Sequence, residues 1–234
     1  MRIADSFAGA PAVDATLDSA ANWDDVYVAG AGYEFYGATG GTTIEFRTPG
    51  TSSRRTVTKH SATGPRSPDY SVWAEYGGSA TTTDRTFYVG LAARIKDGGT
   101  NWDGYALIYT NDYSGTNKLG LFRYDNDSPT ALSSADADLT AGDTFCLEVT
   151  GAGAAVVIKG YKNDVEVVSA TDTSGSRITA AGLGGVEGIS SGQGDTSDDP
   201  LPVLREWRLY ETGRRAALTG PLAGAGQIGH ALAR

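Results

Sequence analysis

The chain has 234 residues, a formal net charge of -9 and a sequence pI near 4.7. This acidic balance argues against a nucleic-acid binder, which needs clustered Lys and Arg, and no stretch is long and apolar enough for membrane insertion. The short basic run of Arg54, Arg55 and Lys59 is better explained as a solvated loop or strand edge. The 32 Gly, the 12 Tyr and the scarcity of helical spacing predict an all-β protein.

Short strands are predicted from the start of the chain. Residues 3–7 are strand-like and lack a long apolar core, so we expect no secretory signal peptide. Residues 33–36 and 43–47 flank a Gly-containing loop and predict a hairpin. Weaker strands are predicted at 26–29 and 55–59.

The clearest signals lie between residues 70 and 124. Strands are predicted at 70–76, 87–95, 104–110 and 118–124, joined by connections rich in Gly, Asp, Asn and Thr. In the second strand one face is wholly apolar, and it comprises Phe87, Val89, Leu91, Ala93 and Ile95. A period of two with one apolar face predicts a half-buried strand.

Further strands follow to the end of the domain. A turn is predicted at 125–129, followed by a strand at 130–133. A meander is predicted at 144–150, 154–159 and 166–170, with turns at 151–153 and 162–164, and the last strands at 182–189 and 203–210. About a dozen short strands at regular spacing predict a sandwich or jelly roll.

The last residues have a different composition. Residues 213–234 are rich in Gly and Ala and cannot bury much apolar surface by themselves. We therefore predict a β-sandwich domain over residues 1–212 and an extended C-terminal docking arm over 213–234. The arm would dock on its own domain or, as we favour, on another chain, through Leu218, Leu222 and Ile228.

The order of these motifs resembles the concanavalin A-like superfamily, and within it the laminin-G-like jelly rolls. The matching stretches are residues 5–7, Leu17, Trp23, 69–74, 89–94, 104–107, 119–123, 142–149, 164–170, 182–185 and 203–210. The resemblance implies a jelly-roll β-sandwich of two antiparallel sheets, one of them commonly curved into a groove. Some members bind carbohydrate, others are enzymes, and many are adhesion or structural modules.

Catalytic patterns are missing from the sequence. A glycoside hydrolase needs two carboxylates about 5 to 9 Å apart, yet Glu75, Glu148 and Glu166 each stand alone on their strands. The motif of the polysaccharide lyases of this fold is not matched by Gln227 to His230. We therefore predict that the protein is not an enzyme.

Oxygen-rich loops raise the question of a structural calcium. They lie at 97–103, 111–112, 125–127 and 195–199, but none has the spacing of a dedicated calcium loop. Asx turns explain most of these residues. We assign no metal and no cofactor.

A sugar-binding platform is predicted if the strands at 70–76 and 87–95 are neighbours. Gly90 and Ala92 would leave space above the sheet, where Trp73 and Tyr88 would stack on sugar rings. Glu75 and Arg94 would bond the hydroxyls. In the competing interpretation the aromatic residues pack under a loop and the charged pair is an ordinary cross-strand ion pair.

Taken together, these features resemble small virion proteins of tailed phages. We predict a non-enzymatic structural component of a virion or similar assembly, such as a capsid decoration, fibre or tail protein, made in the host cytoplasm. It would form a homo-oligomer, contact other virion proteins through the arm and present a glycan- or host-surface-binding face. The alternative is a stand-alone carbohydrate-binding module, and a glycoside hydrolase or polysaccharide lyase ranks below both.

Overall fold

The computed structural model describes residues 2–5, 23–28, 34–37, 44–47, 54–60, 65–78, 87–97, 101–112, 115–190 and 203–211. Within these residues every regular element is a strand. Accordingly, the described part of the chain contains no helix that could cross a membrane. The all-β prediction is confirmed. The predicted docking arm, with Leu218, Leu222 and Ile228, lies outside the described residues.

The strands vary from four to eleven residues. The first seven are β1 (Arg2–Asp5), β2 (Trp23–Val28), β3 (Glu34–Gly37), β4 (Ile44–Arg47), β5 (Arg54–His60), β6 (Tyr70–Gly78) and β7 (Phe87–Asp97). The others are β8 (Trp102–Asn111), β9 (Lys118–Asp125), β10 (Ser128–Asp136), β11 (Thr144–Thr150), β12 (Val156–Lys162), β13 (Val165–Asp172), β14 (Leu183–Ser190) and β15 (Val203–Glu211).

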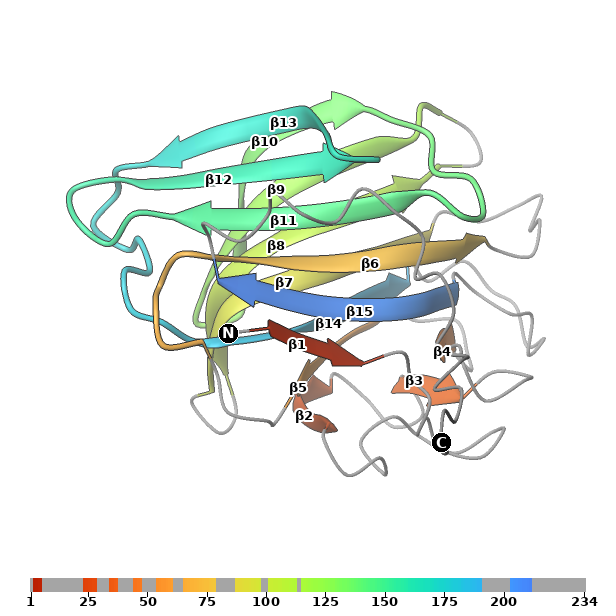
Figure 1. Ribbon diagram of the computed structural model, residues 1–234, viewed down its shortest axis with the longest axis horizontal. Helices are drawn as coiled ribbons and strands as arrows, with labels where there is room; N and C mark the ends of the chain where they lie inside the picture. Colours follow the sequence, from red (N-terminus) through yellow and green to blue (C-terminus); the bar gives the residue numbers. More distant parts are fainter. Residues whose placement is uncertain are drawn as a thin grey trace, which may run out of the picture.

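Two antiparallel sheets form a sandwich (Figure 1). Sheet A has the order β13-β12-β11-β6-β15-β4-β3, with β1 also paired to β15, and it lies in front in Figure 1. Sheet B, behind it, has the order β10-β9-β8-β7-β14-β5-β2. The chain passes from one sheet to the other several times, for example between β6 and β7 and between β10 and β11, as in a jelly roll. The predicted sandwich of two antiparallel sheets is confirmed.

The main core fills the space between the sheets. From sheet B, Phe87, Val89, Leu91 and Ala93 point into it, and each is at most 3% exposed. These residues confirm the inner face predicted for β7. Ile95 does not share this face, because a bulge between Ala93 and Lys96 shifts the pairing of β7 with β8 and turns Ile95 toward the outer side.

A second apolar cluster covers the outer face of sheet B. Its buried members are Val57, Ala92, Ile95, Trp102, Ala106, Ile108 and Tyr124. Tyr88, Phe122 and Leu183 pack against it and are partly buried. Sheet B is therefore apolar on both faces.

Two tight turns match the sequence prediction. Asn126 and Asp127, between β9 and β10, have φ of 51° and 65°, and Asn163 and Asp164, between β12 and β13, have φ of 48° and 64°. Consecutive positive φ values are typical of the two-residue hairpin turns that Asn and Asp favour. The first of these hairpins sets how β10 lies beside β9 at the edge of sheet B.

Candidate functional site

The four residues of the predicted sugar platform do not come together. Trp73 and Glu75 lie on β6 in sheet A, whereas Tyr88 and Arg94 lie on β7 in sheet B. The premise that these two strands are neighbours is wrong. An alternation of period two shows which residues share a face, but it does not identify the neighbouring strand.

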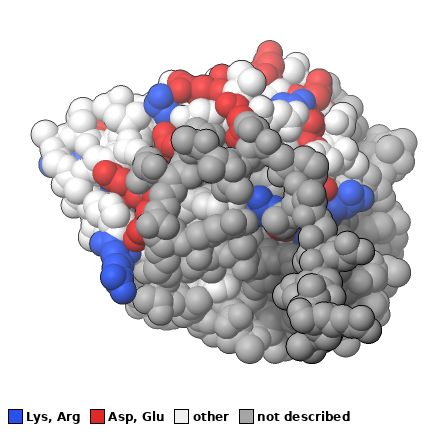
Figure 2. Space-filling view, viewed as in Figure 1, with Lys and Arg blue, Asp and Glu red and all other residues white. Residues whose placement is uncertain are grey.

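Trp73 and Glu75 pair with side chains of β15 on the outer face of sheet A. The Arg208 guanidinium lies 4.5 Å from the centre of the Trp73 ring, and Arg208 Nε donates to Glu206 Oε1 at 2.8 Å. Glu75 forms an ion pair of 3.5 Å with Arg205. In Figure 2, which shows this face, the visible basic side chains are scattered beside acidic ones and form no large patch. Trp73 and Glu75 are thus already engaged in cross-strand contacts.

Arg94 is a buried structural residue. Its side chain is 0% exposed, and its backbone has a φ of 53° within the bulge of β7. The guanidinium donates to the carbonyl oxygens of Pro68 at 2.9 Å, Ile178 at 2.5 Å and Gly151 at 2.7 Å. An ion pair to Asp69 at 3.6 Å completes its surroundings. The expectation that Arg94 bonds sugar hydroxyls on the platform is therefore wrong.

The space expected above Gly90 and Ala92 is filled. Both residues are buried, and a Cβ added at Gly90 would lie 2.7 Å from the carbonyl oxygen of Leu107 and 3.2 Å from Cγ1 of Ile108. Ile108 belongs to the apolar cluster on the outer face. The small residues of β7 thus accommodate the neighbouring strand β8 and leave no room for a ligand.

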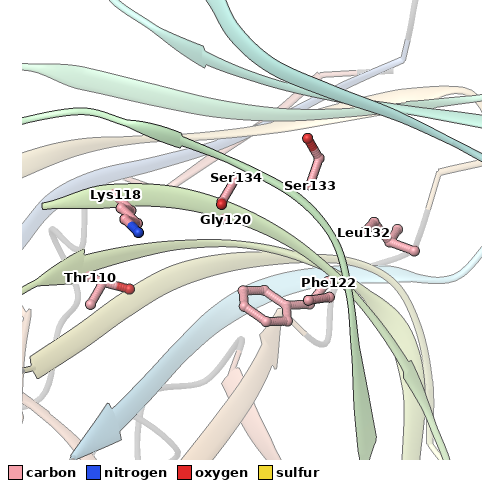
Figure 3. Close-up of a pocket in the computed structure, with 8 residues that line it drawn as sticks. Thr110, Lys118, Gly120, Phe122, Leu132, Ser133 and Ser134 are labelled. Atoms are coloured by element: carbon pink, nitrogen blue, oxygen red, sulfur yellow. The ribbon is translucent and has the colours of Figure 1, made fainter. Parts of the chain in front are cut away.

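A pocket of about 320 Å³ lies farther along the same face, over β8, β9 and β10. It is lined by Thr110, Lys118, Gly120, Phe122, Ala131, Leu132, Ser133 and Ser134. Figure 3 shows Thr110 and Lys118 toward one end of the pocket and Phe122 toward the other, with the Ser134 hydroxyl between them. Ala131 and Ser134 are exposed, so the β10 side of the pocket is open to solvent.

The alternation of β9 places three residues of this strand in the pocket. Leu119 and Leu121 point into the core, so Lys118, Gly120 and Phe122 point outward. A Cβ added at Gly120 would lie 2.8 Å from Cε2 of Phe122. Glycine therefore lets the Phe122 ring lie against the strand, where it forms part of the pocket wall.

An irregularity in β10 shapes the opposite wall. The pairing of β10 with β9 shifts between Ala131 and Ser133. Such a bulge bends the strand and redirects its side chains. It explains why four consecutive residues, 131–134, line one pocket, whereas a regular strand would present only alternate residues.

The lining combines an aromatic ring with hydrogen-bonding groups. Phe122 is half-buried, Thr110, Ser133 and Ser134 supply hydroxyl groups, and Lys118 supplies an ammonium. Tyr88 pairs with Thr110 in register and so stands next to the pocket. Burial raises the pKa of the Tyr88 phenol, and the charge of Asp112 raises it further. Tyr88 thus remains a neutral hydrogen-bonding group at neutral pH.

One carboxylate, Glu187, lies at the centre of the outer face. Glu187 is 0% exposed and pairs in register with Val57 on one side and Gly90 on the other. It does not line the pocket, and the eight lining residues include no carboxylate. The arrangement described here is therefore suited to binding a ligand by contact and hydrogen bonds.

Two carboxylates of the oxygen-rich loops accept hydrogen bonds from backbone groups more than twenty residues away, so these bonds are not the local ones of an Asx turn. Asp127 Oδ1 accepts from the backbone N–H of Trp102, and Asp103 Oδ1 accepts from that of Asn126, both at 2.8 Å. The described residues contain no group of three or more His, Cys, Asp or Glu side chains that could hold a metal ion. These two carboxylates thus join the start of β8 to the turn between β9 and β10.

Phe122 and Lys118 were not among the site residues predicted from the sequence. A signal for Phe122 was present, because Gly120 and Phe122 stand two residues apart in a strand whose alternate residues are leucines. Glycine in a strand interior often marks a close approach by another group. No sequence signal marked the opposite wall, residues 131–134 of β10, because the bulge that shapes it depends on how β10 pairs with β9.

Comparison with known proteins identifies the fold. No protein-family model matches the chain, and no curated protein matches its sequence. Among solved structures, an endo-1,3-beta-glucanase from Streptomyces sioyaensis is similar with a TM-score of 0.56 and 13% identity, over 89% of this chain and 95% of that one. LamAcat from Zobellia galactanivorans is similar with a TM-score of 0.55 and 10% identity, over 89% and 96%.

A third similar structure is the carbohydrate recognition domain of Emp46p in its metal-free form. Its TM-score is 0.53 and its identity 11%, over 83% of this chain and 89% of that one. At such identities the likeness shows the fold alone. The chain therefore has the concanavalin A-like jelly-roll fold that the order of its motifs predicted.

Proposed function

We propose that this protein binds carbohydrate, without cleaving it, in the pocket over β8, β9 and β10. The observation that carries the proposal is the half-buried Phe122 ring held against Gly120, with hydroxyl and ammonium groups around it. An apolar ring face stacks on the C–H face of a sugar, and a few polar groups fix the hydroxyls.

The size and position of the pocket agree with this role. Its volume of about 320 Å³ lies at the lower end of the range of ligand pockets, about 300 to 1,000 Å³. It suits a single sugar unit or part of a longer chain. Because the β10 side is open, a polysaccharide can enter with its neighbouring units in solvent.

The named proteins of similar fold support the class of ligand. One is named a carbohydrate recognition domain and another an endo-1,3-beta-glucanase. Binding and cleavage are separated by the chemistry of the pocket, because hydrolysis usually needs two carboxylates on either side of the scissile bond. The lining of this pocket has none, so we propose a binding protein.

Titration of the protein with a glycan that it binds on a glycan array tests the proposal. Phe122→Ala should weaken binding about tenfold, because it removes the stacking surface. Trp73→Ala is the matched control, since Trp73 lies on the outer face of the other sheet and should leave affinity unchanged. Equal affinity in wild type and Phe122→Ala, with folding verified by near-ultraviolet circular dichroism, would contradict the proposal.

The assembly role predicted from the sequence stays a prediction. It rests on residues 213–234, which lie outside the described residues, and the virion location rests on resemblance. Light scattering of the full chain and of a chain ending at residue 212 tests self-assembly through the arm. A loss of oligomers on truncation would support this role, and identical monomers would exclude self-assembly through the arm.

A further inference from the structure

Lys118 is the basic side chain of the pocket lining, and it is exposed. Several other basic residues of the described region are paired: Arg94 with Asp69, Arg123 with Asp172, Lys159 with Glu166, Lys162 with Asp143, Arg205 with Glu75 and Arg208 with Glu206. Lys118 lines the pocket and makes no ion pair within the described part of the chain. In an acidic protein, an unpaired cation beside a ligand pocket is available to a ligand.

Among the polar groups of the pocket lining, the Lys118 ammonium is the one that favours an anionic ligand. The lining offers three hydroxyl groups and one ammonium but no carboxylate and no amide side chain. Hydroxyls donate and accept, whereas the ammonium only donates. Its best partner is an anionic oxygen, because hydrogen bonds between charged groups are shorter and stronger than neutral ones.

We infer that the ligand is an acidic carbohydrate, whose carboxylate or sulfate group is bound by Lys118 while a sugar ring stacks on Phe122. The inference rests on the proposed carbohydrate-binding function and specifies the chemical class of the ligand. Figure 3 shows Lys118 and Phe122 on opposite sides of the pocket. A sugar ring over Phe122 can therefore direct its acidic group toward Lys118.

Asp136 provides an internal check on this electrostatic argument. It pairs with Lys118 in register, and it is exposed. Residues directly opposite in an antiparallel pair lie side by side on one face, so the Asp136 carboxylate opposes an anion that approaches Lys118. Asp136→Asn should therefore tighten the binding of an acidic sugar and leave the binding of a neutral sugar unchanged.

The test compares acidic saccharides with their uncharged analogues on the full chain. A suitable panel is oligogalacturonate with its methyl ester, and a sulfated galactan oligosaccharide with its desulfated form, measured by calorimetry at low and at physiological salt. We expect an acidic member to bind about fivefold or more tighter than its neutral analogue, with a preference that weakens as salt rises. Lys118→Gln should abolish the preference. Lys96→Gln, at an exposed lysine of β7 outside the pocket, should keep it.

Each outcome decides between the two claims. Neutral analogues that bind as well as the acidic ones, in a manner that depends on Phe122, would overturn the acidic class and leave carbohydrate binding intact. A preference that survives Lys118→Gln would also overturn the inference. If neither the panel nor a general glycan array shows binding, the proposed function fails and the inference fails with it.

Discussion

Replacing Arg94 with methionine should destabilise the protein strongly. The side chain is completely buried, and its guanidinium satisfies the carbonyl oxygens of Pro68, Gly151 and Ile178. These carbonyls belong to three separate segments, so Arg94 joins the end of β7 to the loop before β6 and to two later loops. Methionine fills much of the same space but offers no donor, and all three carbonyls lose a hydrogen bond.

The size of the effect follows from these contacts. A carbonyl left buried without a donor costs about 1 to 3 kcal/mol, and the one of Ile178 is buried. The other two bonds are partly buried, so each adds about 1 kcal/mol. The ion pair with Asp69 adds little, because the Asp69 side chain is 44% exposed. The free energy of unfolding should fall by about 3 to 5 kcal/mol in total.

Guanidinium unfolding followed by tryptophan fluorescence measures this change. The positive φ of 53° at position 94 is equally strained with Arg or Met, so backbone strain cancels in the comparison. Lys96→Met is the control, because this exposed residue lies on the same strand and should change stability by less than about 0.5 kcal/mol. A loss below about 1 kcal/mol for Arg94→Met would refute the assignment of Arg94 as a structural residue.

Two further predictions concern other residues. Burial tends to raise the pKa of Asp143, but hydrogen bonds from Asn163, Thr140 and Lys162 outweigh it and lower this pKa to about 2. A carboxyl whose pKa is lower in the folded than in the unfolded state stabilises the fold at pH values above the unfolded-state pKa. About 2 kcal/mol of the free energy of unfolding should therefore be lost as pH falls from about 4 to 2. Unfolding curves at several pH values should show this loss in the wild type but not in Asp143→Asn. The same dependence of the free energy of unfolding on pH in both proteins would refute the prediction. Gly120→Ala should displace the Phe122 ring from its place against β9 and weaken glycan binding severalfold, while the melting temperature changes little. Calorimetry measures the affinity. Full affinity in Gly120→Ala would show that the position of the ring is unimportant for binding.

The sequence predicted the fold well because the relevant signals are local. The alternation in residues 87–93 identified the inner face of β7, and the Asn and Asp residues of two turns identified their hairpins. Both signals depend only on residues close together in the chain. The order of the motifs resembles that of a known superfamily and so predicted a β-sandwich, which the sheet topology confirms.

The site was predicted poorly because it depends on contacts between distant residues. Trp73 and Tyr88 have the right chemistry for a platform, yet they lie on strands of different sheets. Arg94 was expected on an open face, but the bulge of β7 turns its side chain to carbonyls far along the chain. Periodicity gives no information on strand order or on bulges, and these two features decide where a pocket forms.

Carbohydrate binding at Phe122 is tested most directly by one calorimetric comparison. A saccharide selected on a glycan array would be titrated into the wild type, Phe122→Ala and Trp73→Ala under the same conditions. We expect Phe122→Ala to bind about tenfold more weakly, and Trp73→Ala to match the wild type. Loss of binding in Trp73→Ala with full binding in Phe122→Ala would place the sugar on sheet A and contradict the account.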